Sequence, residues 1–133
     1  AELLKENENL VELDFHDRKV NDEGVSVLSN GLKRNRGLKV LNLFMNKIQP
    51  EGASSLSEGL RNHPSIRTLN LGHNNLTALG ARFVADVLDN TQLQVIFLHN
   101  NGIGDKGAQY ISRALENHPT LTELVLSDNH ITH

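Results

Sequence analysis

The sequence has no cysteine and no tryptophan, and aromatic residues make up only 4% of its 133 positions. Without cysteine the chain can form no disulfide, no thiolate zinc site and no cysteine nucleophile. Extracellular domains of this size often carry disulfides, so the absence favours a cytoplasmic location. The scarcity of aromatic residues means that any hydrophobic core must be aliphatic.

Long apolar runs and an excess of basic charge are also missing. No stretch approaches the length of a transmembrane helix, and the acidic start AELLKENENL lacks the apolar segment of a signal peptide. The 13 basic and 16 acidic residues give a formal net charge of −3. We therefore expect neither nucleic-acid binding nor membrane binding.

Five segments of similar sequence run through the whole chain. They are LVELDFHDRKV from residue 10, LKVLNLFMNKI from 38, IRTLNLGHNNL from 66, LQVIFLHNNGI from 93 and LTELVLSDNHI from 121. The starts are 28, 28, 27 and 28 residues apart. If each start is position 0, positions 0, 3, 5 and 10 are apolar in every copy. Position 8 is asparagine except in the first copy, where it is Arg18. Such a period is typical of a solenoid of stacked units.

The spacing within each copy predicts a strand followed by a helix. Apolar positions 3 and 5 alternate as in a strand, whereas positions 14, 18 and 22 are four residues apart, as on one face of a helix. We expect Asn21 and Thr77 to cap helices, and Pro50 suits a first helical position. Helical returns force the strands to run parallel. The predicted fold is an α/β solenoid with a parallel sheet on its concave face and helices on its convex face.

The repeated pattern L-x-x-L-x-L-x-x-N-x-L resembles the leucine-rich repeat superfamily. The 28-residue period with glycine at position 14 is similar to its ribonuclease-inhibitor-like class, which also includes repeat domains of NOD-like receptors, tropomodulins and Ran GTPase activators. The mammalian inhibitor is rich in cysteine and this chain has none, so its activity is not carried over. The glycines that carry this part of the resemblance are Gly24, Gly52, Gly80 and Gly107.

We expect one domain over residues 1–133. It consists of a partial unit at 1–9, repeats starting at 10, 38, 66 and 93, and a truncated repeat at 121–133. Leu124 and Leu126 would have no return helix of their own to pack against. Because a solenoid needs polar capping units, we expect a fragment of a longer array, or end-to-end packing against another chain.

Motifs for catalysis or cofactor binding are lacking or explained by the repeat. No G-x-S-x-G, G-K-[ST] or H-E-x-x-H motif is present. GIGDKG at 102–107 has the G-x-G-x-x-G spacing of a dinucleotide site, but its last glycine is the repeat's own position 14. We therefore predict no enzyme activity and no cofactor.

The chain has seven histidines, which raises the question of a metal site. His73 and His99 lie in adjacent copies and are expected to converge, but no third ligand is evident beside them, so no metal site is predicted. His63 and His118 follow helix C-termini, where a partial positive charge would complement the helix dipole.

The strand positions that point away from the core carry the functional prediction. Positions 2, 4 and 6 face the concave surface, where the fold is expected to impose no particular residue. The second and fourth copies place large apolar side chains there, and Gly72 between Phe44 and His99 is expected to leave a shallow notch. The predicted partner-binding residues are Val40, Phe44, Met45, Val95, Phe97 and His99, with an acidic rim of Glu12, Asp14 and Glu123.

An apolar centre with a polar rim is typical of a protein–protein interface. The predicted function is therefore a non-catalytic interaction module that binds a protein partner through its concave face. The family resemblance leaves two alternatives open. One is an activator of a small GTPase, and the other is an actin-associated domain like that of tropomodulin.

Overall fold

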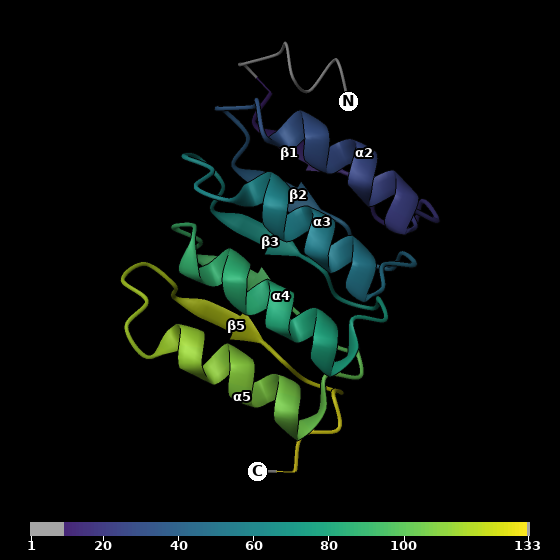
Figure 1. The fold of residues 1–133 in the computed structure, drawn as a ribbon, viewed down its shortest axis with the longest axis vertical. Helices are drawn as coiled ribbons and strands as arrows, with labels where there is room; N and C mark the ends of the chain where they lie inside the picture. The colour runs from purple at the N-terminus through teal and green to yellow at the C-terminus, as the bar shows by residue number, and fades with distance from the viewer. Residues whose placement is uncertain (1–9, 133) are drawn as a thin grey trace.

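A computed structural model of the protein describes residues 10–132 and shows strands and helices in regular alternation (Figure 1). The partial unit expected at residues 1–9 lies outside the described residues. The five strands and four helices formed by residues 10–132 are β1 (Glu12–Asp14), α2 (Asp22–Leu32), β2 (Val40–Asn42), α3 (Pro50–Leu60), β3 (Thr68–Asn70), α4 (Thr77–Asp89), β4 (Val95–Phe97), α5 (Gly104–Leu115) and β5 (Glu123–Val125).

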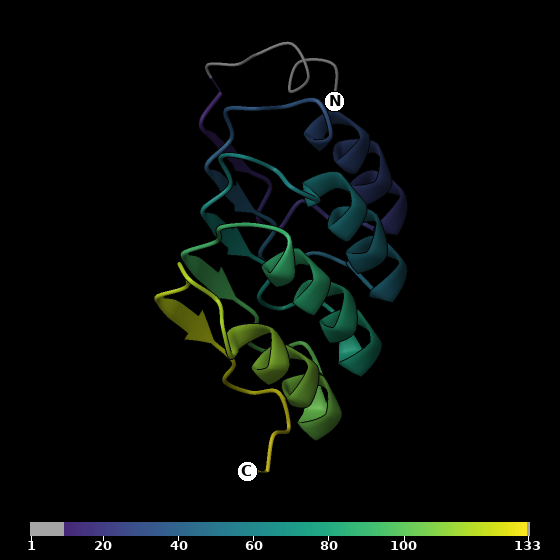
Figure 2. The ribbon, with the colours of Figure 1, turned by 60° about the vertical axis from the view of Figure 1, so that its left-hand side comes forward.

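The strands form one parallel sheet in chain order, from β1 to β5. Equivalent repeat positions pair directly, so that Leu41 lies opposite Leu69 and Leu69 opposite Ile96. The strands occupy one layer and the helices the other, as Figure 2 shows. Helices need about 8–10 Å between axes and strands about 4.8 Å, so the stack curves with the sheet on the inner side. We call the sheet surface away from the helices the concave face. The predicted α/β solenoid is confirmed.

The hydrophobic core lies between the sheet and the helices and is aliphatic, as the composition required. Leu41, Leu69 and Ile96 are fully buried, as are Leu60 and Leu88 on the helices. In the last unit, Leu124 and Leu126 are only partly buried. The short strands therefore depend on this layer of packed side chains for most of their stability.

Position-8 asparagines connect successive turns by hydrogen bonds. Asn101 illustrates the pattern: its Nδ2 donates to the carbonyl oxygens of Leu71 (2.8 Å) and Leu98 (3.1 Å), and its Oδ1 accepts from the Leu76 N–H (3.3 Å). Each side chain thus satisfies backbone groups of two units at once. The same arrangement recurs at Asn46, Asn74 and Asn129.

The helix starts follow the sequence prediction at two places and depart from it at a third. Asn21 caps α2 by accepting the Gly24 N–H at 3.0 Å, and Pro50 begins α3. The prediction for Thr77 was wrong, because its side chain makes no capping bond and its backbone has φ of 61°. The Thr77 N–H instead donates to the Asn101 carbonyl oxygen at 2.9 Å. Stacking on the next unit therefore fixes this turn.

The dipole interpretation of His63 was also wrong. The ring is 5% exposed, and burial, together with the positive charges of Arg36 and Arg67, lowers the pKa of His63 to about 4. Its Nδ1 accepts the N–H groups of Ser65 and Ile66 at 3.3 and 3.2 Å. At neutral pH the ring is therefore an uncharged acceptor that closes the turn from α3 into β3.

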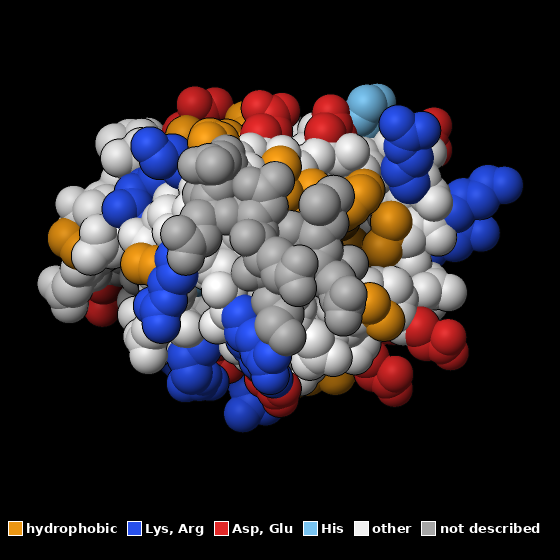
Figure 3. Space-filling view, turned by 90° about the horizontal axis from the view of Figure 1, so that it is seen from above, with side chains coloured by type: hydrophobic (Ala, Val, Ile, Leu, Met, Phe, Trp, Pro, Cys, Tyr) orange, Lys and Arg blue, Asp and Glu red, His pale blue; other side chains and the backbone are white. Residues whose placement is uncertain are grey.

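Figure 3 views the stack from the end that carries β1 and shows hydrophobic side chains at the surface beside the grey residues. Val11 and Val27 in this unit are 49% and 57% exposed. No helix within residues 10–132 is both long enough and apolar enough to cross a lipid bilayer.

Candidate interaction site on the concave face

The structure places the sequence-predicted residues on the concave face, with unequal exposure. Phe44, Phe97 and His99 are half-buried, whereas Met45 is 42% exposed. Val40 and Val95 are also half-buried, and the rim residues Glu12, Asp14 and Glu123 are exposed.

Four rings meet where β2, β3 and β4 end, and we call Phe44, His73, Phe97 and His99 the aromatic cluster. The Phe44 ring centroid lies 5.1 Å from that of His73 and 5.5 Å from that of His99. The two histidine rings are 5.2 Å apart, and Phe97 lies 6.4 Å from His99. Most of these contacts are edge-to-face, an arrangement that aromatic rings favour. The convergence of His73 and His99 predicted from the sequence is confirmed, and His73 joins the predicted site.

The notch expected at Gly72 is absent. Gly72 is buried, and the imidazole of His99 lies across it, so that any side chain at residue 72 would collide with the ring. The ring of His99 therefore fills the space that the missing side chain of Gly72 leaves, and no notch remains. As a result Phe44, His99 and Phe97 form a continuous surface.

The surroundings of His99 disfavour a positive charge on its ring. Burial, with the nearby His73, lowers the pKa of His99, although Asp128 acts in the opposite direction. The Nδ1 atom of His99 is buried and has no hydrogen-bond partner in the described structure. His73 uses its own Nδ1 in a 2.9 Å contact with the Asn100 amide nitrogen. A mostly apolar surface of this kind suits contact with a protein side chain.

At repeat position 4, Phe97 differs from the polar residues of the first three copies. In the first three copies this position carries Asp14, Asn42 and Asn70, whose Oδ1 atoms accept the backbone N–H two residues further on at 3.0 Å. The expectation that the fold imposes nothing here was therefore wrong for these copies. The recurrence of Asp or Asn at this position in the sequence indicates this side-chain-to-backbone hydrogen bond. Phe97 in the fourth copy and Val125 in the fifth replace that acceptor, so the turn does not explain either side chain, and Phe97 is the one in contact with the other rings.

Repeat position 7 makes Met45 exceptional in the same way. This position has a positive φ in all five copies, between 52° and 58°. The left-handed conformation costs an ordinary side chain about 1–2 kcal/mol, and Asn and Asp tolerate it best. Met45 is both left-handed and exposed, and neither property stabilises the fold. The other residues at this position are polar: Asp17, His73, Asn100 and Asp128.

The acidic rim is organised at its β1 end. Asp14 Oδ1 accepts the N–H of His16 at 3.0 Å and contacts the His16 Nδ1 at 2.6 Å. These hydrogen bonds hold the pKa of Asp14 below its ordinary value.

Within residues 10–132, no group of three or more His, Cys, Asp or Glu side chains is placed to hold a metal ion.

Stacked strand–turn–helix units with an asparagine ladder define an α/β solenoid repeat protein. A family model described as "Leucine Rich repeat" matches residues 34–57, 62–85, 89–112 and 117–132, which together make up more than half of the chain. The chain therefore belongs to the leucine-rich repeat family, whose repeats form protein-interaction modules.

Solved structures share the fold. One is the actin-binding site 2 of leiomodin-1, with a TM-score of 0.85 and 22% identity over 94% of this chain and 75% of that chain. Another is the tropomodulin C-terminal domain of Caenorhabditis elegans, with a TM-score of 0.81 and 23% identity over 95% and 79%. No curated protein matches this chain significantly in sequence.

Proposed function

We propose that the protein is a non-catalytic interaction module that binds a protein partner through its concave face, at the aromatic cluster and Met45. One observation carries this proposal. Met45 and Phe97 replace the polar residues that the repeat uses for its own turns, and both lie beside or within the aromatic cluster. Residues that depart from a structural pattern without stabilising the fold are candidates for function.

The proposed partner surface would present one or more apolar side chains. Phe44, Phe97 and Met45 together offer enough apolar area for several kcal/mol of binding free energy. The exposed carboxylates of Glu12, Asp14 and Glu123 lie toward the two ends of the sheet. A partner with an apolar centre flanked by basic residues would complement them.

Actin is the specific partner that the comparisons favour. The leiomodin-1 structure that shares this fold is described as an actin-binding site, which supports testing actin first. The same similarity, together with the lack of cysteine, supports a cytoplasmic location.

The test uses a variant that removes the proposed site while restoring the repeat pattern. In Met45→Asn/Phe97→Asn, each new side chain matches a residue found at the same repeat position in another copy, so folding should be retained. The matched control is Val27→Asn, which removes an exposed apolar side chain from the convex helix α2. Wild type and the two variants are compared in affinity capture from a cell lysate and in co-sedimentation with actin filaments.

A partner held by wild type and Val27→Asn but lost by the double variant would support the concave-face proposal. Equal capture by all three proteins would disprove it. If a partner depends on the site and yet nothing sediments with actin, the actin assignment alone fails.

A further inference from the structure

The turns that lead from each helix into the next strand form a row on the edge opposite the aromatic cluster. Repeat position 25 supplies the acceptor that closes three of them. Asn35 Oδ1 accepts the N–H groups of Gly37 and Leu38, and the Nδ1 atoms of His63 and His118 accept the equivalent groups in their turns. Two of these turns contain a His-Pro pair, His63-Pro64 and His118-Pro119.

The third turn is the exception. The third copy is one residue shorter than the others, and where its neighbours read NHPSI and NHPTL it reads NTQL, residues 90–93. Thr91 at position 25 directs its hydroxyl to the Val87 carbonyl oxygen at 2.7 Å, back into its own helix α4. The turn at residues 90–93 is therefore shorter than the two His-Pro turns on either side of it.

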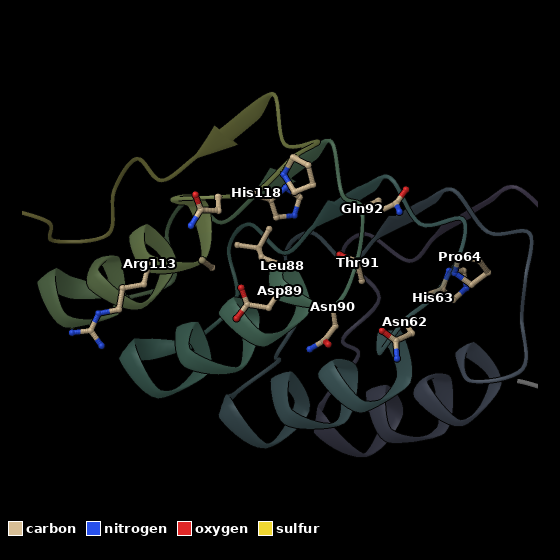
Figure 4. A pocket seen from close by; sticks show the side chains of 13 residues that line it. Asn62, His63, Pro64, Leu88, Asp89, Asn90, Thr91, Gln92, Arg113 and His118 are labelled. Carbon is tan, nitrogen blue, oxygen red and sulfur yellow. The ribbon is translucent and has the colours of Figure 1, made fainter.

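A cavity of about 550 Å³ lies at this place, and we call it the short-turn groove. Figure 4 shows Thr91 between His118 on one side and His63 with Pro64 on the other, with Leu88 next to His118. The groove thus results from a deletion in the repeat. Its location is independent of the concave face.

His118 lines this groove and carries a donor without a partner. Because its Nδ1 accepts the N–H groups of Thr120 (3.3 Å) and Leu121 (3.1 Å), the ring proton must reside on Nε2. That Nε2 atom is buried and has no hydrogen-bond partner within the described residues. In the equivalent ring of His63, Nε2 contacts Asn35 Oδ1 at 3.3 Å. In the unit before that of His118, Thr91 occupies the position that Asn35 occupies before His63. The Nε2–H group of His118 therefore has no equivalent acceptor.

The other residues that line the groove determine what kind of group could accept a hydrogen bond from His118. Asp89 places a carboxylate at the groove, which disfavours an anion, and the side chain of Arg113 extends away from the other labelled residues (Figure 4). Leu88 and the proline rings provide apolar contacts. The amide side chains are both donors and acceptors, as peptide groups are; they belong to Asn62, Asn90, Gln92 and Asn117.

From these observations we infer that the short-turn groove is a second binding site, which takes an extended, uncharged peptide segment with a main-chain carbonyl oxygen on the Nε2–H of His118. The peptide group satisfies the buried donor without bringing a charge beside Asp89. The amide side chains bind further main-chain groups, and the proline rings contact the peptide's side chains. The site is separate from the concave-face site and can be occupied together with it.

The test uses the full chain labelled with ¹⁵N and two short capped peptides, acetyl-Ala-Ala-Ala-amide and acetyl-Ala-Asp-Ala-amide. Saturable shifts of the Thr91 and Gln92 amide signals and of the His118 Nε2 signal are expected with the neutral peptide. His118→Asn should weaken this binding about tenfold, the usual effect of losing one hydrogen bond. The variant keeps the turn, because an asparagine oxygen closes the equivalent turn at Asn35.

Two further variants complete the experiment. Thr91→His/Gln92→Pro with a serine inserted after residue 92 rebuilds the His-Pro turn and should abolish binding. His130→Asn makes the same chemical change at an exposed residue outside the groove and should leave binding unchanged. The proposal is overturned if the neutral peptide causes no saturable shift, if His118→Asn binds as well as wild type, or if only the aspartate-containing peptide binds.

Discussion

The imidazole of His99 occupies the space that a side chain at Gly72 would need. The two residues belong to adjacent units, and the absence of a Cβ in one leaves room for the ring of the other. From this seat His99 contacts both Phe44 and Phe97. The shape of the aromatic cluster thus depends on a glycine that contributes no surface of its own.

Gly72→Ala should therefore displace the ring of His99. The atoms that a new Cβ would meet are the far end of the imidazole, which can swing away, so the free energy of unfolding should change by less than about 1 kcal/mol. Burial is the main cause that lowers the pKa of His99, so this pKa should rise toward its ordinary value. NMR titration of the histidine signals measures the change, and the signal is assigned by its loss in His99→Asn. An unchanged pKa would mean that the ring keeps its place.

Met45→Asn should make the protein more stable. Residue 45 has φ of 56° and is 42% exposed, so the methionine adopts a left-handed conformation without the benefit of burial. Asparagine tolerates this conformation and occupies it at residue 100. We expect the free energy of unfolding to rise by about 1 kcal/mol. Urea denaturation measures it, and a lower stability would show that Met45 is needed for packing.

Asn101→Ala should cost more than any surface substitution. It leaves the buried Leu76 N–H without an acceptor. It also removes one of the two asparagine hydrogen bonds that the Leu71 and Leu98 carbonyl oxygens each accept. One unsatisfied buried group costs about 1–3 kcal/mol and each lost hydrogen bond about 0.5–1.5 kcal/mol, so we expect a loss of at least about 2 kcal/mol. The control Asn30→Ala, at an exposed site in α2, should change stability by no more than about 0.5 kcal/mol. A similar small effect for both variants would refute the structural role of the ladder.

Repetition explains why so much of the fold was predictable. A strand position that is apolar in five copies is buried or partly buried in all of them, because every unit solves the same packing problem. The order of the elements, the parallel sheet and the asparagine ladder followed from this periodicity. Thr77 was mispredicted because its conformation depends on the neighbouring Asn101 carbonyl group, which a local capping rule does not consider.

The site was predictable only in part. Position in the strand placed Phe44 and Phe97 on the concave face, but the sequence could not tell how the rings would pack. His73 enters the cluster by contacts with Phe44 and His99 of the two neighbouring units, and the space beside Gly72 is occupied by the ring of His99. Both facts concern contacts between units. The short-turn groove did leave a signal in the sequence, which is the single 27-residue spacing between copies. The spacing alone does not show that a groove lies beside the shortened turn.

Stability should fall in mild acid because of His63. Its pKa is about 4 in the folded protein, chiefly through burial, and about 6.5 when unfolded. As the pH falls through about 6.5 the unfolded chain binds a proton that the folded chain does not, so the free energy of unfolding decreases down to about pH 4 and levels off below it. Above about pH 6.5 both states are neutral and His63 contributes no pH dependence.

The variant His63→Asn tests this prediction. Its side chain keeps an acceptor for the Ser65 and Ile66 N–H groups, as Asn35 provides one in its own turn, but cannot titrate. Urea unfolding of both proteins between about pH 4 and pH 7.5 should therefore show a steeper decline for wild type. Parallel curves would mean that His63 titrates equally in the folded and unfolded chain, and that its ring is more hydrated than its 5% exposure indicates.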